Sequence, residues 1–75
     1  MTTETEVQIL IYLLKEGNDA PTNIAKSIER SPEYVTSRLS ELAEEDLLVE
    51  TKGSGVYRLT PEGAELARAY LRENT

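Results

Sequence analysis

The sequence has no cysteine, no histidine and no tryptophan among its 75 residues. Without cysteine or histidine the chain lacks disulfides, the common zinc ligands, a thiol nucleophile and an imidazole base. Its hydroxyl groups therefore have no base of the usual kind to activate them. We expect a protein that is not an enzyme and that uses no metal, redox signal or cofactor.

Long apolar runs are also missing, and none approaches the roughly 20 residues that span a bilayer. The first residues, Met-Thr-Thr-Glu-Thr-Glu, are polar and acidic, whereas a signal peptide begins with basic residues. A chain of this length supports one hydrophobic core, so residues 1–75 should form a single domain. We expect this domain to be soluble and cytoplasmic.

Basic residues are few: 8 Lys plus Arg stand against 14 Asp plus Glu, for a net charge of −6. Residues 1–30 carry five acids and three bases, and residues 31–75 carry nine acids and five bases. Neither half is basic, although DNA-binding proteins usually carry a positive field. A nucleic-acid partner must therefore be argued from architecture and not from overall charge.

Apolar spacing and capping signals predict an α+β domain of four helices and a hairpin. Thr3 and Glu6 form a capping box, and Ser31 is a suitable N-cap before Pro32. Alternation of period 2 flanks Gly53-Ser54-Gly55, as in a hairpin with a three-residue loop. The predicted elements are a helix over 3–16, a helix over 20–29, a helix over 32–46, a hairpin over 47–60 and a helix over 61–73.

The first helix has more apolar residues than one core face needs. Val7, Leu10, Ile11 and Leu14 recur at i, i+3, i+4 and i+7 and are predicted to face the core. The rest of the predicted core is Ile24, Ala25, Ile28, Val35, Leu39, Leu42, Leu47, Leu48, Val49, Tyr57 and Leu59.

Two further apolar stripes are left over, one on the first helix and one on the last. They consist of Ile9, Tyr12 and Leu13, and of Ala64, Ala67, Tyr70 and Leu71. We expect them to form a homodimer interface, since a two-fold dimer would match a palindromic DNA site. The alternative is that the two stripes cover each other within one chain.

Two stretches carry a resemblance to a known family. The first runs from Ile24-Ala25 through Ser31 and Val35-Thr36-Ser37-Arg38-Leu39 to Leu47-Leu48, and the second is Tyr57-Arg58-Leu59-Thr60-Pro61-Glu62-Gly63. With these stretches the chain resembles small prokaryotic winged helix-turn-helix transcription regulators, in particular the short halophage-repressor-like proteins of haloarchaea. The resemblance covers nearly the whole chain. It departs at Asp46, where relatives usually have glycine at a position that requires positive φ.

The resemblance implies that helix 32–46 is a recognition helix whose N-terminal half enters the major groove of double-stranded DNA. Arg38 is the one long cation on its presumed outer surface and has the geometry to contact guanine O6 and N7. The other candidates for DNA contact on or before this helix are Ser31, Glu33, Tyr34, Thr36 and Ser37. The alternative is that these are ordinary exposed residues, with Arg38 paired to Glu41 or Glu45.

The hairpin and the preceding helix add candidate phosphate contacts, namely Lys52, Ser54 and Arg58 on the hairpin and Lys26 and Arg30 before it. The five cations among the candidates, set against Glu33 and Glu41, give the presumed DNA face a charge of +3 and leave −9 on the rest of the chain. This asymmetry favours a nucleic-acid surface.

Two functions from different classes follow. The first is a DNA-binding transcription regulator that reads the major groove with helix 32–46 and contacts the backbone with the wing. The second is a winged-helix module for protein–protein interaction without DNA binding, for which an acidic surface is no handicap.

The composition predicts a protein that works in concentrated salt; the alternative is an ordinary acidic mesophile protein. The chain has 14 acids and only 3 Lys against 5 Arg, and Glu44-Glu45-Asp46 stand at a helix end where the dipole disfavours them. Repulsion among these carboxylates should destabilise the fold until salt at about 1 M shortens the Debye length to roughly 3 Å. The melting temperature should therefore rise between about 0.1 and about 2 M KCl. Thermal melts across that series test this, and an unchanged midpoint would contradict it.

Overall fold

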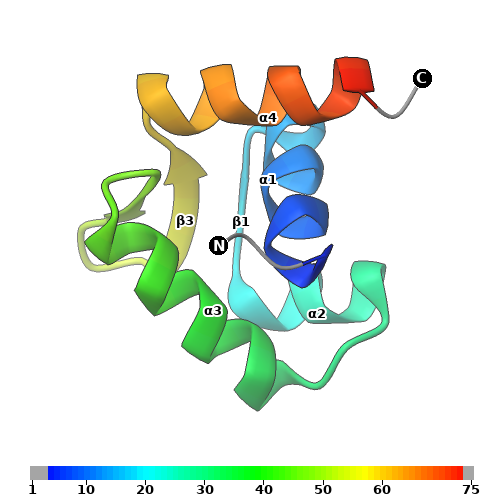
Figure 1. The fold of residues 1–75 in the computed structure, drawn as a ribbon. Helices are drawn as coiled ribbons and strands as arrows, with labels where there is room; N and C mark the ends of the chain where they lie inside the picture. Colours follow the sequence, from blue (N-terminus) through cyan, green and yellow to red (C-terminus); the bar gives the residue numbers. More distant parts are fainter. Residues whose placement is uncertain (1–3, 74–75) are drawn as a thin grey trace.

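The computed structural model describes residues 4–73, which form four helices and three short strands (Figure 1). Thr3 of the predicted capping box lies outside the described residues. The predicted order of three helices, a hairpin and a last helix is confirmed. The elements are α1 (Glu4–Glu16), β1 (Asn18–Asp19), α2 (Pro21–Ile28), α3 (Pro32–Glu44), β2 (Leu48–Thr51), β3 (Val56–Leu59) and α4 (Pro61–Glu73).

Local signals set the bounds of α2 and α3. The Ser31 Oγ accepts a hydrogen bond from the Tyr34 N–H at 3.2 Å, which confirms Ser31 as the N-cap of α3. Helix α3 ends two residues earlier than predicted, and Asp46 then adopts φ 62°, as expected where glycine is usual. A second residue of this kind, Glu29, ends α2 with φ 59° and is not predicted by the sequence.

The sheet has three strands, in the order β1–β3–β2, where the sequence predicted a hairpin of two. In β1, Asn18 and Asp19 lie opposite Arg58 and Tyr57 of β3. This strand was missed because two residues are too short to show a period of 2. Both pairings are antiparallel, so β3 is the central strand.

The hairpin loop comprises the four residues 52–55 and not three, because Thr51 pairs with Val56 across the loop. Ser54 holds this loop together. Its N–H and Oγ both donate to the Thr51 carbonyl oxygen, at 3.2 and 3.0 Å, and its Oγ accepts from the Val56 N–H at 3.2 Å.

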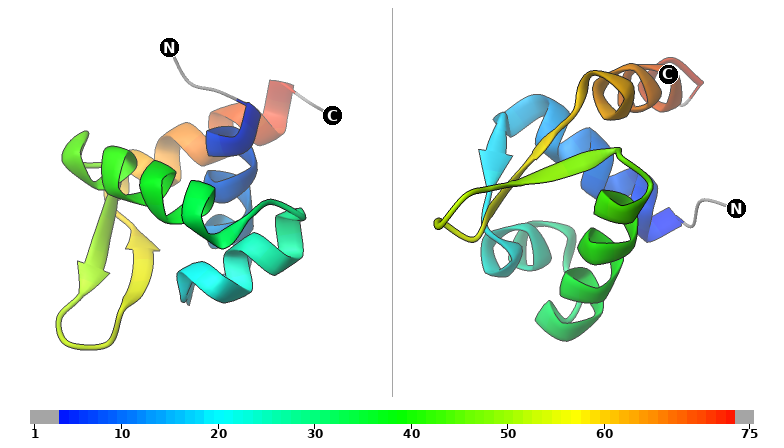
Figure 2. Two further views of the ribbon diagram at one scale, coloured as in Figure 1. Left: turned by 90° about the horizontal axis from the view of Figure 1, so that it is seen from below. Right: turned by 90° about the vertical axis from the view of Figure 1, so that its left-hand side faces the viewer.

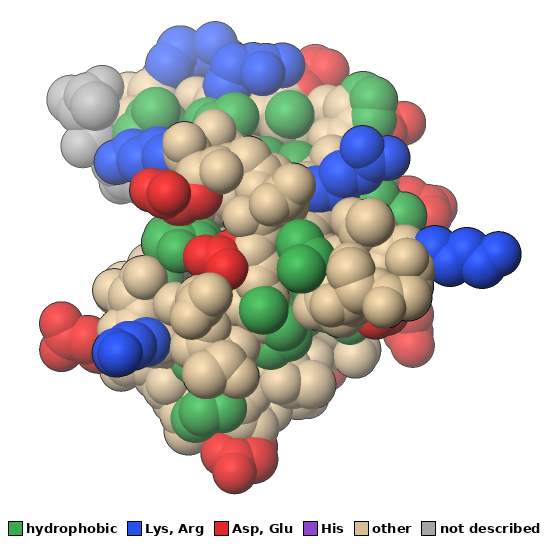
Figure 3. Space-filling model, turned by 180° about the vertical axis from the view of Figure 1, so that it is seen from behind, with side chains coloured by type: hydrophobic (Ala, Val, Ile, Leu, Met, Phe, Trp, Pro, Cys, Tyr) green, Lys and Arg blue, Asp and Glu red, His purple; other side chains and the backbone are tan. Residues whose placement is uncertain are grey.

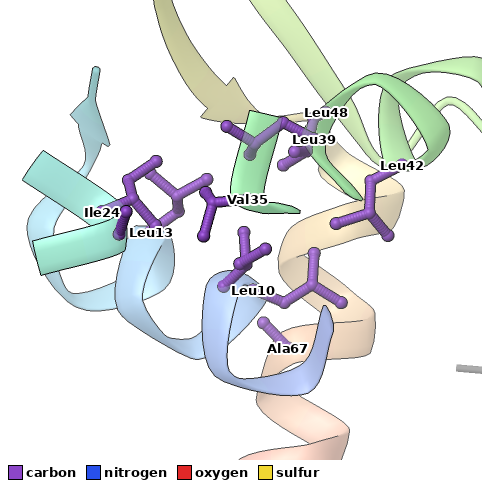
Figure 4. Packing of buried hydrophobic residues seen from close by; sticks show 10 residues of the cluster. Leu10, Leu13, Ile24, Val35, Leu39, Leu42, Leu48 and Ala67 are labelled. Carbon is purple, nitrogen blue, oxygen red and sulfur yellow. The ribbon is translucent and has the colours of Figure 1, made fainter. Parts of the chain in front are cut away.

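The core lies where α1, α2, α3 and the start of β2 converge on the middle of α4 (Figure 4). Its central side chains are 0–3% exposed. They are Ile9, Leu10, Leu13, Ile24, Ala25, Val35, Leu39, Leu42, Leu48 and Ala67.

The predicted inward face of α1 is wrong. Ile9, Leu10 and Leu13 are fully buried, whereas Val7, Ile11 and Leu14 are only half-buried. Two sets of positions on α1 have the same helical spacing, namely 7, 10, 11 and 14, and 6, 9, 10 and 13. Periodicity alone favours the first set, because all four of its residues are apolar whereas the second set includes Glu6. The structure uses the second set because α1 packs on one side against α4 and on the other against α2 and α3 (Figure 1).

Val49 is predicted to lie in the core, but it is 40% exposed. Successive residues of a strand point to opposite faces of a sheet. Since Leu48 points into the core, Val49 must point away from it.

The start of α4 is fixed to the turn that follows α3. The Thr60 Oγ1 donates to the Asp46 carbonyl oxygen at 2.6 Å and accepts from the Gly63 N–H at 3.0 Å. The Thr60 N–H donates to the Leu47 carbonyl oxygen at 3.1 Å. A Cβ on Gly63 would lie 1.9 Å from that same oxygen, so the close approach requires glycine.

Replacing Gly63 by alanine should therefore destabilise the fold, although alanine is the better helix former. The added methyl group would meet backbone, which cannot rotate away, and overpacking of this kind costs about 1–3 kcal/mol. Urea melts of Gly63→Ala measure the loss. The neighbouring exposed position gives the control, because Glu62→Ala should stay within about 0.5 kcal/mol of the parent protein. Equal stability of both variants would contradict the close contact.

Candidate nucleic-acid interface

Helices α2 and α3 and the hairpin lie on one side of the molecule, with α1 and α4 behind them (Figure 2, left). A short turn over residues 29–31 joins the two helices, and the hairpin extends beyond the C-terminal half of α3 (Figure 2). The structure thus places the predicted recognition helix beside the predicted wing.

The outer surface of α3 is polar. Val35, Leu39 and Leu42 are buried on the inner side, so the opposite side of the helix faces solvent. Thr36 and Ser37 are exposed, and their hydroxyl groups have no hydrogen bond within residues 4–73. The exposed residues of α3 and its cap are Ser31, Pro32, Glu33, Tyr34, Thr36, Ser37, Ser40, Glu41 and Glu44.

Arg38 lies on the flank of α3 and not at its outermost point. Its guanidinium forms an ion pair with Glu41 and lies over the Tyr34 ring, with 5.4 Å between Cζ and the ring centroid. Its Nε is buried and has no hydrogen-bond partner among the described residues. The alternative reading of the sequence, an ion pair within the helix, is what the structure contains, and Glu41 is the partner.

The hairpin presents two exposed cations. Lys52 stands at the start of the loop, and Arg58 lies on the central strand opposite Val49 and Asn18. Paired residues share a sheet face, so Arg58 and the exposed Val49 point to the same side. Ser54, the third candidate on the hairpin, uses its hydroxyl to build the loop.

The two cations before α3 differ in their surroundings. Lys26 is exposed on α2. Arg30 lies in the turn and donates from Nε to the Thr5 Oγ1 at 3.3 Å and from Nη1 to the Glu29 carbonyl oxygen at 3.4 Å. Arg30 therefore ties the turn to the first residues of α1.

The charge of α3 itself is negative, since its three glutamates outnumber Arg38 and give −2. Figure 3 shows the face opposite to that of Figure 1, where basic side chains gather at the upper edge, at the level of α4, and further basic and acidic side chains are scattered below it. Helix α4 carries two arginines, Arg68 and Arg72. Part of the positive charge therefore lies away from α3.

Tyr12 and Asp19 connect α1 to the start of α2. The Tyr12 hydroxyl donates to an Asp19 carboxylate oxygen at 2.5 Å, and the other oxygen accepts from the Asn23 side chain at 2.9 Å and the Ala20 N–H at 2.8 Å. These bonds, that from Tyr12 foremost, hold the pKa of the Asp19 carboxyl below its usual value. The Asp19 carboxylate in turn raises the pKa of the Tyr12 hydroxyl.

Three members of the predicted dimer interface lie in the core of the monomer. Ile9, Leu13 and Ala67 are at most 1% exposed, so they are not a free surface in the folded chain. Their burial follows from the packing of α1 on α4, as the alternative reading of the two stripes expected. The half-buried members are Tyr12, Ala64, Tyr70 and Leu71.

Within residues 4–73, no group of three His, Cys, Asp or Glu side chains is placed to hold a metal ion. The helices of this part of the chain are also too short and too polar to cross a membrane.

Comparisons with known proteins identify the fold. No protein-family model and no curated protein matches the chain. Among solved structures it is similar to ZitR of Lactococcus lactis, with 24% identity and a TM-score of 0.88 over 99% of this chain and 53% of that one. A MarR family protein of Mycobacterium tuberculosis gives 20% identity and a TM-score of 0.84 over 95% and 53%.

The adhesin competence repressor AdcR of Streptococcus pyogenes is 26% identical, with a TM-score of 0.84 over 96% of this chain and 57% of that one. The chain has the winged helix-turn-helix fold. It spans about half the length of these neighbours. Helix α3 is the second helix of the helix-turn-helix, and β2 and β3 form the wing.

The bond between Tyr12 and Asp19 should make stability depend on acid. Since the pKa of Asp19 is depressed in the fold, its contribution is present above about pH 4 and is lost as the pH falls through the folded value. In Tyr12→Phe the largest cause of this depression is gone, so acid unfolding should begin at a higher pH. The difference in stability between variant and parent should be largest near neutral pH and shrink toward pH 2.

Urea melts between about pH 7 and about pH 2 measure this dependence. Tyr57→Phe is the matched control, because Tyr57 is also half-buried but has no hydrogen bond from its hydroxyl within the described residues. A Tyr12→Phe variant whose stability follows that of Tyr57→Phe at every pH would contradict the role given to the bond.

Proposed function

We propose that the chain is a DNA-binding transcription regulator that places α3 in the major groove and the wing on the phosphate backbone. The observation that carries the proposal is the position of α3, whose exposed polar surface lies beside a hairpin with two exposed cations. A helix presented in this way has the width to enter the major groove, and its first turns reach base edges.

The neighbours support the regulator and not an enzyme. One of them is named a repressor, and another belongs to the MarR family. In the proposed mode Thr36, Ser37 and Arg38 contact bases, whereas Lys26, Lys52 and Arg58 contact phosphates. The Ser31 hydroxyl accepts from the Tyr34 N–H and keeps its own proton to donate to a phosphate, whereas the Ser54 hydroxyl both donates and accepts within the loop and supports its shape. Arg30, Glu33 and Tyr34 border this surface.

A second function, a protein-binding module, is favoured by the charge of α3. This helix carries −2, and its one arginine is paired with Glu41. A surface of this kind suits a basic partner protein better than a polyanion. The DNA experiments below separate the two functions.

Dimerisation is also a proposal. The half-buried residues Tyr12, Ala64, Tyr70 and Leu71 are the members of the predicted interface that remain available in the folded chain. A dimer would present two copies of α3 about one DNA turn apart. We also propose that the protein is related to the haloarchaeal repressors and that it works in concentrated salt. The acidic composition supports both proposals.

Substitutions on α3 and on the wing should affect DNA binding differently. We expect selection from a random duplex library to enrich a binding sequence. For that duplex Arg38→Ala should lose about 1–3 kcal/mol and relax the preference at one base pair. Lys52→Ala should weaken selected and unrelated duplexes equally, and should reduce the slope of log K against log salt by about 0.9.

The control is Arg68→Ala, which removes an exposed arginine from α4, on the side away from α3. It should bind like the parent protein. If Arg38→Ala and Lys52→Ala also bind like the parent, the contact surface lies elsewhere. If no duplex is enriched, the protein-binding module is the better account.

A further inference from the structure

Arg38 is held by two residues of its own helix, one on each side. Glu41, three residues later, pairs with its Nη2, and the ring of Tyr34, four residues earlier, lies under the guanidinium. The buried Nε has no acceptor within the part of the chain that the structure describes. The guanidinium is therefore ordered, yet its hydrogen-bonding capacity is only partly used.

The two partners of Arg38 differ in how easily they are exchanged. The Glu41 side chain is 47% exposed and that of Arg38 is 21% exposed, so the carboxylate is the outer member of the pair. An exposed ion pair three residues apart on a helix is weak and is screened by salt. Stacking on Tyr34 uses the face of the guanidinium and leaves its edge available to another acceptor.

We propose that Glu41 is a specificity-determining residue that masks Arg38 in the free protein and yields it to DNA. This inference rests on the proposed function. On binding, the guanidinium stays on Tyr34 and exchanges the Glu41 carboxylate for an acceptor on the duplex. Because Glu41 competes at this site, a guanine that offers two acceptors can displace it, whereas a single phosphate contact gains little.

Glu41→Gln tests the mask, because it keeps the shape of the side chain and removes its charge. At about 0.1 M salt the Kd for the selected duplex should fall about two- to fivefold, the range of an exposed ion pair. In the Arg38→Ala background the same substitution should give almost no gain. The gain should also shrink at about 1 M salt, where the Debye length is roughly 3 Å.

The matched control is Glu44→Gln, which removes an exposed charge of the same sign from the same helix. General repulsion between acids and DNA does not involve Arg38, so any gain from Glu44→Gln should be equal with and without Arg38. Circular dichroism melts of the five variants, which are Arg38→Ala, Glu41→Gln, Glu44→Gln and the two double variants, verify that they are folded.

The two proposals fail in distinguishable ways. A parent protein that binds no duplex overturns both. The second case is a parent protein whose DNA binding depends on Lys52. If Glu41→Gln then gives no gain in affinity, or gives the same gain without Arg38, the masking role of Glu41 is overturned and the proposed function stands. A gain that requires Arg38 supports the mask.

Discussion

The contact between the start of α4 and the turn after α3 is the constraint on which the arrangement of the other elements depends. Thr60 bonds to the carbonyl oxygens of Asp46 and Leu47, and Gly63 packs directly on that of Leu47. The hairpin starts at Leu48 and ends at Leu59, so this one junction holds both of its ends. The wing can therefore take only one direction relative to α3. In the sequence Leu-Thr-Pro-Glu-Gly, the threonine caps α4, the proline begins the helix and the glycine permits the close contact.

From this junction the core extends along α1. Ala67 on α4 lies against α1, and Leu10 and Leu13 of α1 continue toward Val35 and Ile24 (Figure 4). Because the inner side of α3 is buried, its polar side faces solvent. The junction between α4 and the turn after α3 places the wing next to this polar side. The proposed DNA surface is thus a consequence of how α4 and α1 pack behind it.

The sequence predicted the elements well because their signals are local. Ser31 and Pro32, the hairpin glycines and the positive φ of Asp46 each act within a few residues. What escaped prediction depends on distant partners. The buried face of α1 is decided by α4, and β1 exists only because β3 is beside it. At the site, the sequence predicts for Arg38 either a contact with DNA or an ion pair within the helix. Spacing could not choose between them, because a side chain three residues away reaches the same guanidinium that a base would contact.

The acidic charge of α3 is compatible with the proposed DNA binding because specificity is a ratio of affinities. Non-specific binding comes almost entirely from contacts between cations and phosphates. A helix with net charge −2 weakens non-specific binding to every duplex. In the proposed mode the exposed wing cations Lys52 and Arg58 supply a limited number of phosphate contacts. The proposed base contacts by Thr36, Ser37 and Arg38 would add affinity only on the matching sequence. Negative charge on α3 therefore weakens binding to every duplex by about the same factor and leaves the ratio of affinities unchanged, because that ratio is set by contacts to the bases.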